Sequence, residues 1–306
     1  GMLTDEKFCE AALKFMLLRD TEGRYFTLDE YKTLVEAEQT NADSKIVYLY
    51  ATDATAQYNY IKAANDRGYN VLLLDGQLDN HFVSLLERKL ENTELVRVDA
   101  DVVDNLIRKN DRKSAGLSPV DTAILSQLFQ DDTHKVEKAN FTVQFEALGE
   151  NDRPIVLTQN EYMRRMKEMA ALQPGMSFYG ELPDSYQLVV NTEHPLVKDI
   201  REKADSALAA TVQPLLDNIE ALNADAEKIR KDAGDKPLSA EDEQRVKDLE
   251  KEVADARSAQ SKAIADYAAQ LPEVSQLVDL ALLGNGLLRG EQLSAFIDRS
   301  VKLMQK

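Results

Sequence analysis

The sequence predicts an α/β domain followed by an α+β domain, for three reasons. Between Lys45 and Val98, short apolar runs alternate with helical periodicity, a pattern typical of βαβ units. The next apolar runs flank a polar loop, and beyond Pro195 the pattern becomes almost wholly helical. The chain has 306 residues, enough for two packed units. We therefore expect a small three-layer αβα domain over residues 1–112 and a mixed domain over residues 113–306.

The first domain is expected to contain a parallel sheet. Its strands are the buried apolar runs at residues 46–50, 71–74 and 95–98. Asp53 is suited to cap a helix over residues 54–66, and Asp79 is suited to cap the next helix. Helices that connect such strands cover the faces of the sheet, which gives the three layers.

The second domain is expected to begin with a helix over residues 119–130 and a β-hairpin. The hairpin strands would be residues 141–148 and 154–157, joined by the polar loop between them. Asn160 would then cap a helix that runs to Leu172, and a further strand would follow at residues 186–190.

Two longer helices show a heptad spacing of their apolar residues. These residues are Leu215, Ile219, Leu222, Ala226 and Ile229 in the first helix, and Val246, Leu249, Val253 and Ala256 in the second. Residues 232–237 interrupt the pattern, and Ser239 with Asp242 resembles a capping box. We expect an antiparallel helical hairpin. Its charged outer faces are either the solvated flanks of a coiled coil or an arm that docks a partner.

Two shorter, apolar helices are expected at the end of the chain, over residues 273–283 and 291–304. Such helices cannot fully cover each other's apolar faces, so they must pack on the domain or on another chain. The sequence leaves both options open.

The charge of the chain excludes several classes of partner. Lys and Arg number 37 against 54 Asp and Glu, and the net charge of −17 repels phosphate backbones and anionic membranes. The longest apolar runs are far shorter than the roughly 20 residues that cross a bilayer. Cys9 is the single cysteine, and the first residues do not form a signal peptide. We expect a soluble, cytoplasmic protein that binds neither nucleic acid nor membrane.

The chain contains no recognisable catalytic motif. The chain lacks a phosphate-binding loop, and the spacing of His81, His134 and His194 does not suit a metal site. We therefore expect no catalytic residue, no metal and no cofactor in this segment. One alternative is a small α/β enzyme with a carboxylate-rich site at the strand ends; its residues would be Thr52, Asp53, Asp75 and Asp99. Another is a structural coiled-coil adaptor organised by the helical hairpin.

A thioether-rich stripe is the most informative surface candidate. On a helix, Tyr162, Met166 and Met169 share a face, and Met163 projects beside it. Flexible, polarizable side chains of this kind suit a surface that accepts varied apolar partners. Ordinary core packing would produce the same pattern.

Several segments together resemble the ninety-kilodalton heat-shock chaperones, most closely their bacterial HtpG type. The segments are YFTLDEY at 25–31, IVYLYAT at 46–52, GYNVLLLD at 68–75, YMRRMK at 162–167, VNTEHPLV at 190–197 and LVDLALL at 277–283. Their order and spacing cover most of the chain. The resemblance implies the later part of the family's middle domain, followed by its C-terminal dimerisation domain.

The resemblance also implies a function. The parent would be an ATP-dependent stress chaperone that uses ATP and magnesium in a domain absent from this segment. The segment itself would not hydrolyse ATP. It would bind unfolded or partly folded client proteins and form a homodimer.

The same resemblance assigns roles to individual residues. The client-facing positions are Tyr162, Met163, Met166 and Met169 on one helix, and His81 and Ser84 in the first domain. The positions matching the dimer bundle are Leu277, Leu280, Leu283, Phe296 and Ile297. The heptad helices, at about residues 204–269, have no counterpart in the better-known bacterial relative and are interpreted as an insertion.

Overall fold

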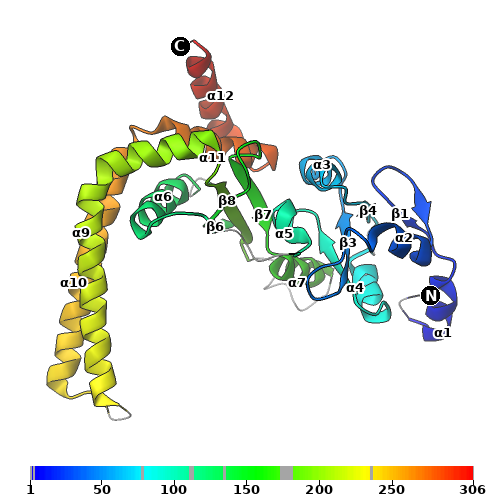
Figure 1. The fold of residues 1–306 in the computed structure, drawn as a ribbon, viewed down its shortest axis with the longest axis horizontal. Helices are drawn as coiled ribbons and strands as arrows, with labels where there is room; N and C mark the ends of the chain where they lie inside the picture. The colour runs from blue at the N-terminus through cyan, green and yellow to red at the C-terminus, as the bar shows by residue number, and fades with distance from the viewer. Residues whose placement is uncertain are drawn as a thin grey trace.

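The computed structural model describes residues 2, 4–76, 79–109, 114–133, 136–172, 182–234 and 237–305. Within these residues, a domain with a parallel sheet lies at one end, a mixed sheet lies in the middle, and a long helical hairpin lies at the other end (Figure 1). The expected domain boundary at residues 112–113 falls within the gap at 110–113 and so lies outside the described part of the chain.

The first domain is built around a three-stranded parallel sheet, as predicted. Its order is β4-β3-β5, and the strands are β3 (Ile46–Ala51), β4 (Val71–Leu73) and β5 (Thr93–Arg97). Its helices are α1 (Glu6–Leu13), α2 (Leu28–Val35), α3 (Tyr58–Asp66), α4 (Asp79–Lys89) and α5 (Val103–Leu106). A small antiparallel ribbon of β1 (Leu18–Arg19) and β2 (Tyr25–Phe26) precedes α2.

Strand β3 shows why this domain has three layers. Every residue of β3 is buried, and alternate side chains belong to two different cores. Tyr48 and Tyr50 pack with residues of α2 and α4, whereas Val47 and Leu49 pack with residues of α3 and α5. A strand covered on both faces reads as a continuous apolar run, which is the pattern that predicted it.

Helix α3 starts later than predicted. The Asp53 carboxylate accepts hydrogen bonds from the backbone N–H groups of Thr55 and Ala56, but the helix begins only at Tyr58. The reason is the side chain of Gln57, whose Oε1 accepts the N–H groups of Thr52 and Asp53 and so holds the chain in a turn before the helix.

The second domain contains a mixed sheet of order β6-β8-β7. Its elements are α6 (Pro119–Asp131), β6 (Ala139–Glu146), β7 (Ile155–Gln159), α7 (Glu161–Leu172) and β8 (Asp184–Asn191). The predicted pairing of the two strands around the polar loop is wrong. Strand β8 lies between them, parallel to β6 and antiparallel to β7. This strand takes the centre because Leu188, Val189 and Val190 are fully buried.

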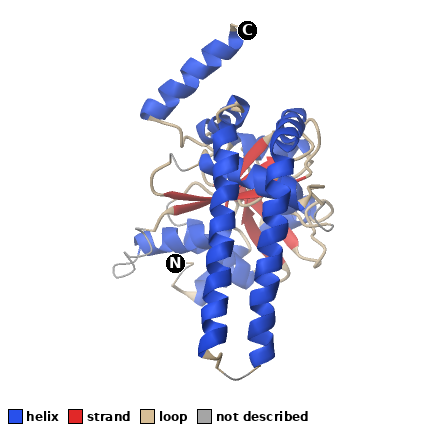
Figure 2. Ribbon diagram, turned by 90° about the vertical axis from the view of Figure 1, so that its left-hand side faces the viewer, coloured by secondary structure: helices blue, strands red, loops and turns tan. Residues whose placement is uncertain are grey.

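The heptad helices form the predicted antiparallel hairpin of α9 (Pro195–Ala233) and α10 (Ala240–Ala268) (Figure 2). Ser239 caps α10 by accepting the N–H of Asp242 at 3.1 Å. Helix α9 bends partway along its length (Figure 1), and it contains Pro214. Proline lacks the N–H for the helical hydrogen bond and clashes with the preceding turn, which accounts for the bend.

The last two helices, α11 (Pro272–Gly284) and α12 (Gly290–Met304), join the largest core. The near part of the hairpin belongs to the same core, through Ala204, Leu208, Val212 and Ile264. The far part has its own small cluster around Ile219, Val253 and Ala256. In the described part of the chain, no helix combines the length and the apolar character needed to span a bilayer.

Candidate functional site

Helix α7 carries most of the predicted client-facing residues. The side chain of Asn160 accepts the N–H of Met163 at 3.1 Å, which confirms the predicted cap. The helix leaves the end of β7 and lies beside the first domain (Figure 1). It therefore has one face toward the first domain and another toward solvent.

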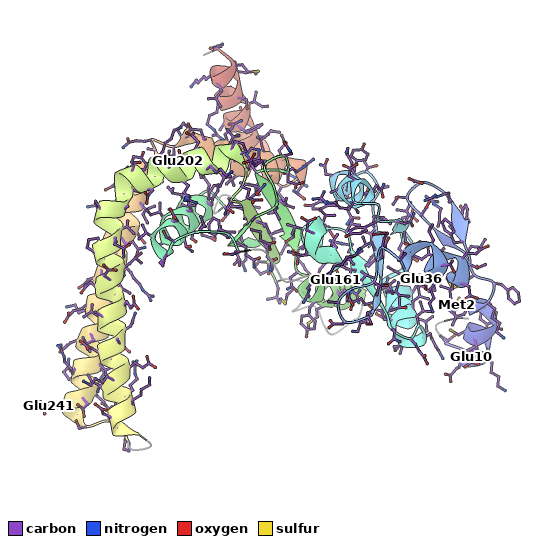
Figure 3. The ribbon with its side chains drawn as sticks, viewed as in Figure 1. Met2, Glu10, Glu36, Glu161, Glu202 and Glu241 are labelled. Carbon is purple, nitrogen blue, oxygen red and sulfur yellow. The ribbon has the colours of Figure 1, made fainter. Side chains whose placement is uncertain are left out.

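The inner face of α7 is charged. Glu161 Oε1 accepts hydrogen bonds from the Tyr50 hydroxyl at 3.0 Å, from Arg164 Nη2 at 2.8 Å and from Arg165 Nε at 2.6 Å. Arg165 also forms a two-pronged ion pair with Glu87 of α4, at 2.9 and 3.2 Å, and donates to the backbone carbonyl of Leu95. We call Tyr50, Glu87, Glu161, Arg164 and Arg165 the α7 clamp. Figure 3 shows Glu161 at the junction with the first domain.

The clamp perturbs the acid–base properties of its members. Burial alone would raise the pKa of the Glu161 carboxyl, but the charges and hydrogen bonds of Arg164 and Arg165 outweigh burial and lower it below its usual value. Burial raises the pKa of the Tyr50 hydroxyl to about 12. At neutral pH the carboxylate is charged and the phenol is protonated, so Tyr50 can donate to Glu161.

The clamp was not predicted from the sequence. The signal available was the sequence Glu-Tyr-Met-Arg-Arg, because Glu161 and the two arginines at i+3 and i+4 must share one helix face. Their partners Tyr50 and Glu87 lie 111 and 78 residues away along the chain and had no local signal.

The outer face of α7 exposes apolar side chains. Tyr162 is 68% exposed and Met163 is 41% exposed, so neither is a core residue of this chain. Met166 is half-buried and, with Met163, lines a small hollow against Leu182 and Pro183. The side chain of Met169 lies outside the described part of the structure.

His81 and Ser84 are half-buried on α4. The Glu87–Arg165 ion pair joins this helix to α7, one turn beyond Ser84 and nearly two turns beyond His81. The structure therefore places the two predicted positions on the helix next to α7, while the polar link between the helices is at Glu87.

The predicted dimer residues divide into two groups. Leu277 and Phe296 are buried in the core of their own chain. Leu280, Leu283 and Ile297 are exposed, as are Val301 and Met304, which were not among the predicted positions. The buried Asp279 of α11 pairs with Arg299 of α12, and Gln276 donates to the Ser300 hydroxyl at 2.8 Å. These contacts hold the two helices together and leave one apolar side uncovered.

The residues of the enzyme alternative have local structural partners. Thr52 and Asp53 bond within the turn before α3, and Asp99 forms an ion pair with Arg97 at 2.5 Å. Asp75 lies 3.9 Å from Arg19. Among the residues that the structure describes, no group of three or more His, Cys, Asp or Glu side chains could hold a metal.

Comparison with known proteins adds direct evidence of relationship. No family model matches the chain. The chain is 48% identical over 307 aligned residues to the chaperone protein HtpG of Porphyromonas gingivalis. It is 45% identical to that of Bacteroides fragilis and 40% identical to that of Bacteroides thetaiotaomicron. Each alignment covers 99% of this chain, the helical hairpin included, and 45% of the relative. The chain is thus homologous to a part of the HtpG chaperones, which confirms the family resemblance of its sequence.

Proposed function

We propose that this chain is the client-holding and dimer-forming part of an HtpG-type chaperone. The observation that carries the proposal is the exposed apolar pair Tyr162 and Met163 on the outer face of α7. Contact with apolar segments of an unfolded chain removes surface from water, and a few such contacts give weak, reversible binding. Residues Met166, Met169, His81 and Ser84 would extend this surface.

A second copy of the chain would cover the uncovered side of α11 and α12. The exposed Leu280, Leu283 and Ile297 support this proposal, because two chains that bring such faces together form an isologous interface. Leu277 and Phe296 would stabilise α11 and α12 within their own chain rather than contact the second copy. A dimer presents two client faces at once, so weak contacts reinforce each other.

The chain spans 45% of the length of these relatives, and we propose that ATP hydrolysis belongs to the rest of the parent protein. ATP and magnesium would bind there, while the present segment holds the client without catalysis of its own. We further propose that the protein is cytoplasmic and that its two domains span residues 1–112 and 113–306. The hairpin at about 204–269 would be an insertion in the second domain.

Client binding can be tested with an unfolded probe. Fluorescein-labelled, reduced and carboxymethylated α-lactalbumin is titrated with the chain, and the dissociation constant is read from fluorescence anisotropy. We expect Tyr162→Ser combined with Met163→Ser to weaken binding by about tenfold, because two apolar contacts are lost. Phe15→Ser is the matched control, because Phe15 is 80% exposed but lies in the first domain, far from α7 in the sequence. Equal weakening by both changes would reject α7 as the client surface.

A further inference from the structure

The first domain, rather than the second, supplies the main polar contacts of α7. The Tyr50 hydroxyl of β3, the Glu87 carboxylate of α4 and the Leu95 carbonyl of β5 all bond the inner face of the helix. On the side of its own domain, Lys167 of α7 forms an ion pair with Asp184 at 2.6 Å, and these side chains are 31% and 41% exposed. The better shielded contacts are those that cross between the domains.

The residues just before α7 are bound to the same part of the first domain. The backbone N–H of Gln159, the last residue of β7, donates to the carbonyl of Asp99 at 2.9 Å. The side chain of Gln159 accepts from Arg97 Nη2 at 2.8 Å. The start of the helix and its first turn are therefore fixed to the end of β5.

The charges of the clamp balance within the interface. Glu87 and Glu161 face Arg164 and Arg165; the Arg164 side chain is 4% exposed, and the side chains of the other three are 23–29% exposed. A shielded, charge-assisted network of this kind is strong when complete and costly when one member is removed, because the remaining charge is left without its partner. The contacts of the α7 clamp can also break together, because water and counter-ions can replace ionic contacts when two domains separate.

We propose that Glu87 and Arg165 are positioning residues for client binding. Through the α7 clamp they fix the client-facing helix to the first domain. Tyr162 and Met163 then lie on a rigid surface that spans both domains. This inference rests on the proposed client-binding function. It adds that the binding surface depends on domain docking, and that the first domain contributes through the orientation of α7 as well as through His81 and Ser84.

Two single variants and their combination test the role of the Glu87–Arg165 ion pair. Glu87→Ala and Arg165→Ala both break the ion pair between α4 and α7, so each is expected to weaken binding of the unfolded α-lactalbumin probe by about tenfold. Arg165→Ala also removes the bonds to Glu161 and to the Leu95 carbonyl, so the double variant is expected to be no weaker than Arg165→Ala alone. Lys62→Ala with Asp66→Ala is the control, because it removes an exposed ion pair of α3. Arg165→Lys keeps the charge without the two-pronged geometry and should fall between wild type and Arg165→Ala.

A second readout separates positioning from loss of folding. Spin labels at Asn65→Cys in the first domain and Asp266→Cys in the second report the distance between the domains, and Cys9 does not interfere because it is buried. In Glu87→Ala the distance distribution should broaden while the circular dichroism spectrum stays that of the wild type. An unchanged distance distribution, or additive losses of affinity in the double variant, would contradict the proposed role of the α7 clamp. If the wild type fails to bind the probe, the proposed function fails, and the distance measurement still decides whether the clamp fixes the domains.

Discussion

The hydroxyl group of Tyr60, on α3 of the first domain, lies 2.7 Å from Oδ1 of Asn285, the residue just after α11. The same hydroxyl contacts the carbonyl of Leu157 on β7. These contacts border a cavity of about 280 Å³ between the domains, lined by α3, β7 and the end of α11. Tyr60 thus links the first domain directly to the helix proposed to form the dimer.

Removal of the Tyr60 hydroxyl should loosen this link. Burial raises the pKa of the phenol well above its usual range, so it remains a hydrogen-bond donor at neutral pH. Tyr60→Phe is expected to lower the free energy of unfolding by about 1–2 kcal/mol, because acceptors at the interface lose their donor. Urea denaturation measures the change. Tyr58→Phe, at an exposed position of the same helix, should have no effect, and an equal effect there would contradict the prediction.

Acid should weaken domain docking through Glu161. Its pKa lies below the usual 4.5, so the folded state favours the charged form. The stabilisation is fully present above pH 4.5 and is lost as the pH falls through the lowered pKa of the folded state, because the unfolded chain binds the proton more readily. Urea midpoints measured down this range should fall more steeply for wild type than for Glu161→Gln. Parallel pH profiles for the two proteins would exclude this role for Glu161.

The proposed dimer can be tested on the exposed side of the terminal helices. Ile297→Asp puts a charge at a position that is 50% exposed, so the monomer should keep its fold while the apolar contact with a second copy is lost. We expect the solution mass across a dilution series to change from dimer to monomer. Phe15→Ser should remain dimeric. A wild type that is monomeric at every concentration would reject the proposed interface.

The helical hairpin can be shortened without entering the main core. Residues 217–256 lie in its far part, beyond Val212 and Leu216 and before Ile264, and a short Gly-Ser linker would join the remaining helices. We expect this deletion to preserve the dimer and client binding, measured by solution mass and anisotropy. The adaptor alternative instead predicts that a partner of the hairpin is lost while the rest of the chain is unaffected. Deletion of the whole range 204–269 would not distinguish the chaperone from the adaptor, because it would also remove Ala204, Leu208 and Ile264 from the core.

The sequence by itself determined the helices and strands in which the spacing of apolar residues shows which side chains are buried. The apolar run of β3 predicted a strand covered on both faces, and the heptad spacing of Ile219, Val253 and their neighbours predicted the helical hairpin. The order and spacing of six segments, from YFTLDEY at 25–31 to LVDLALL at 277–283, indicated the resemblance to the HtpG chaperones, which the comparisons confirm.

Only the tertiary structure decided which elements meet. It placed β8 between β6 and β7, buried Leu277 while exposing Leu280, and paired Arg165 with Glu87. Periodicity records whether a side chain faces a core, but it does not record which distant strand or charge lies opposite. Those choices depend on the total apolar area buried and on the pairing of every shielded charge, quantities that exist only once the chain has folded.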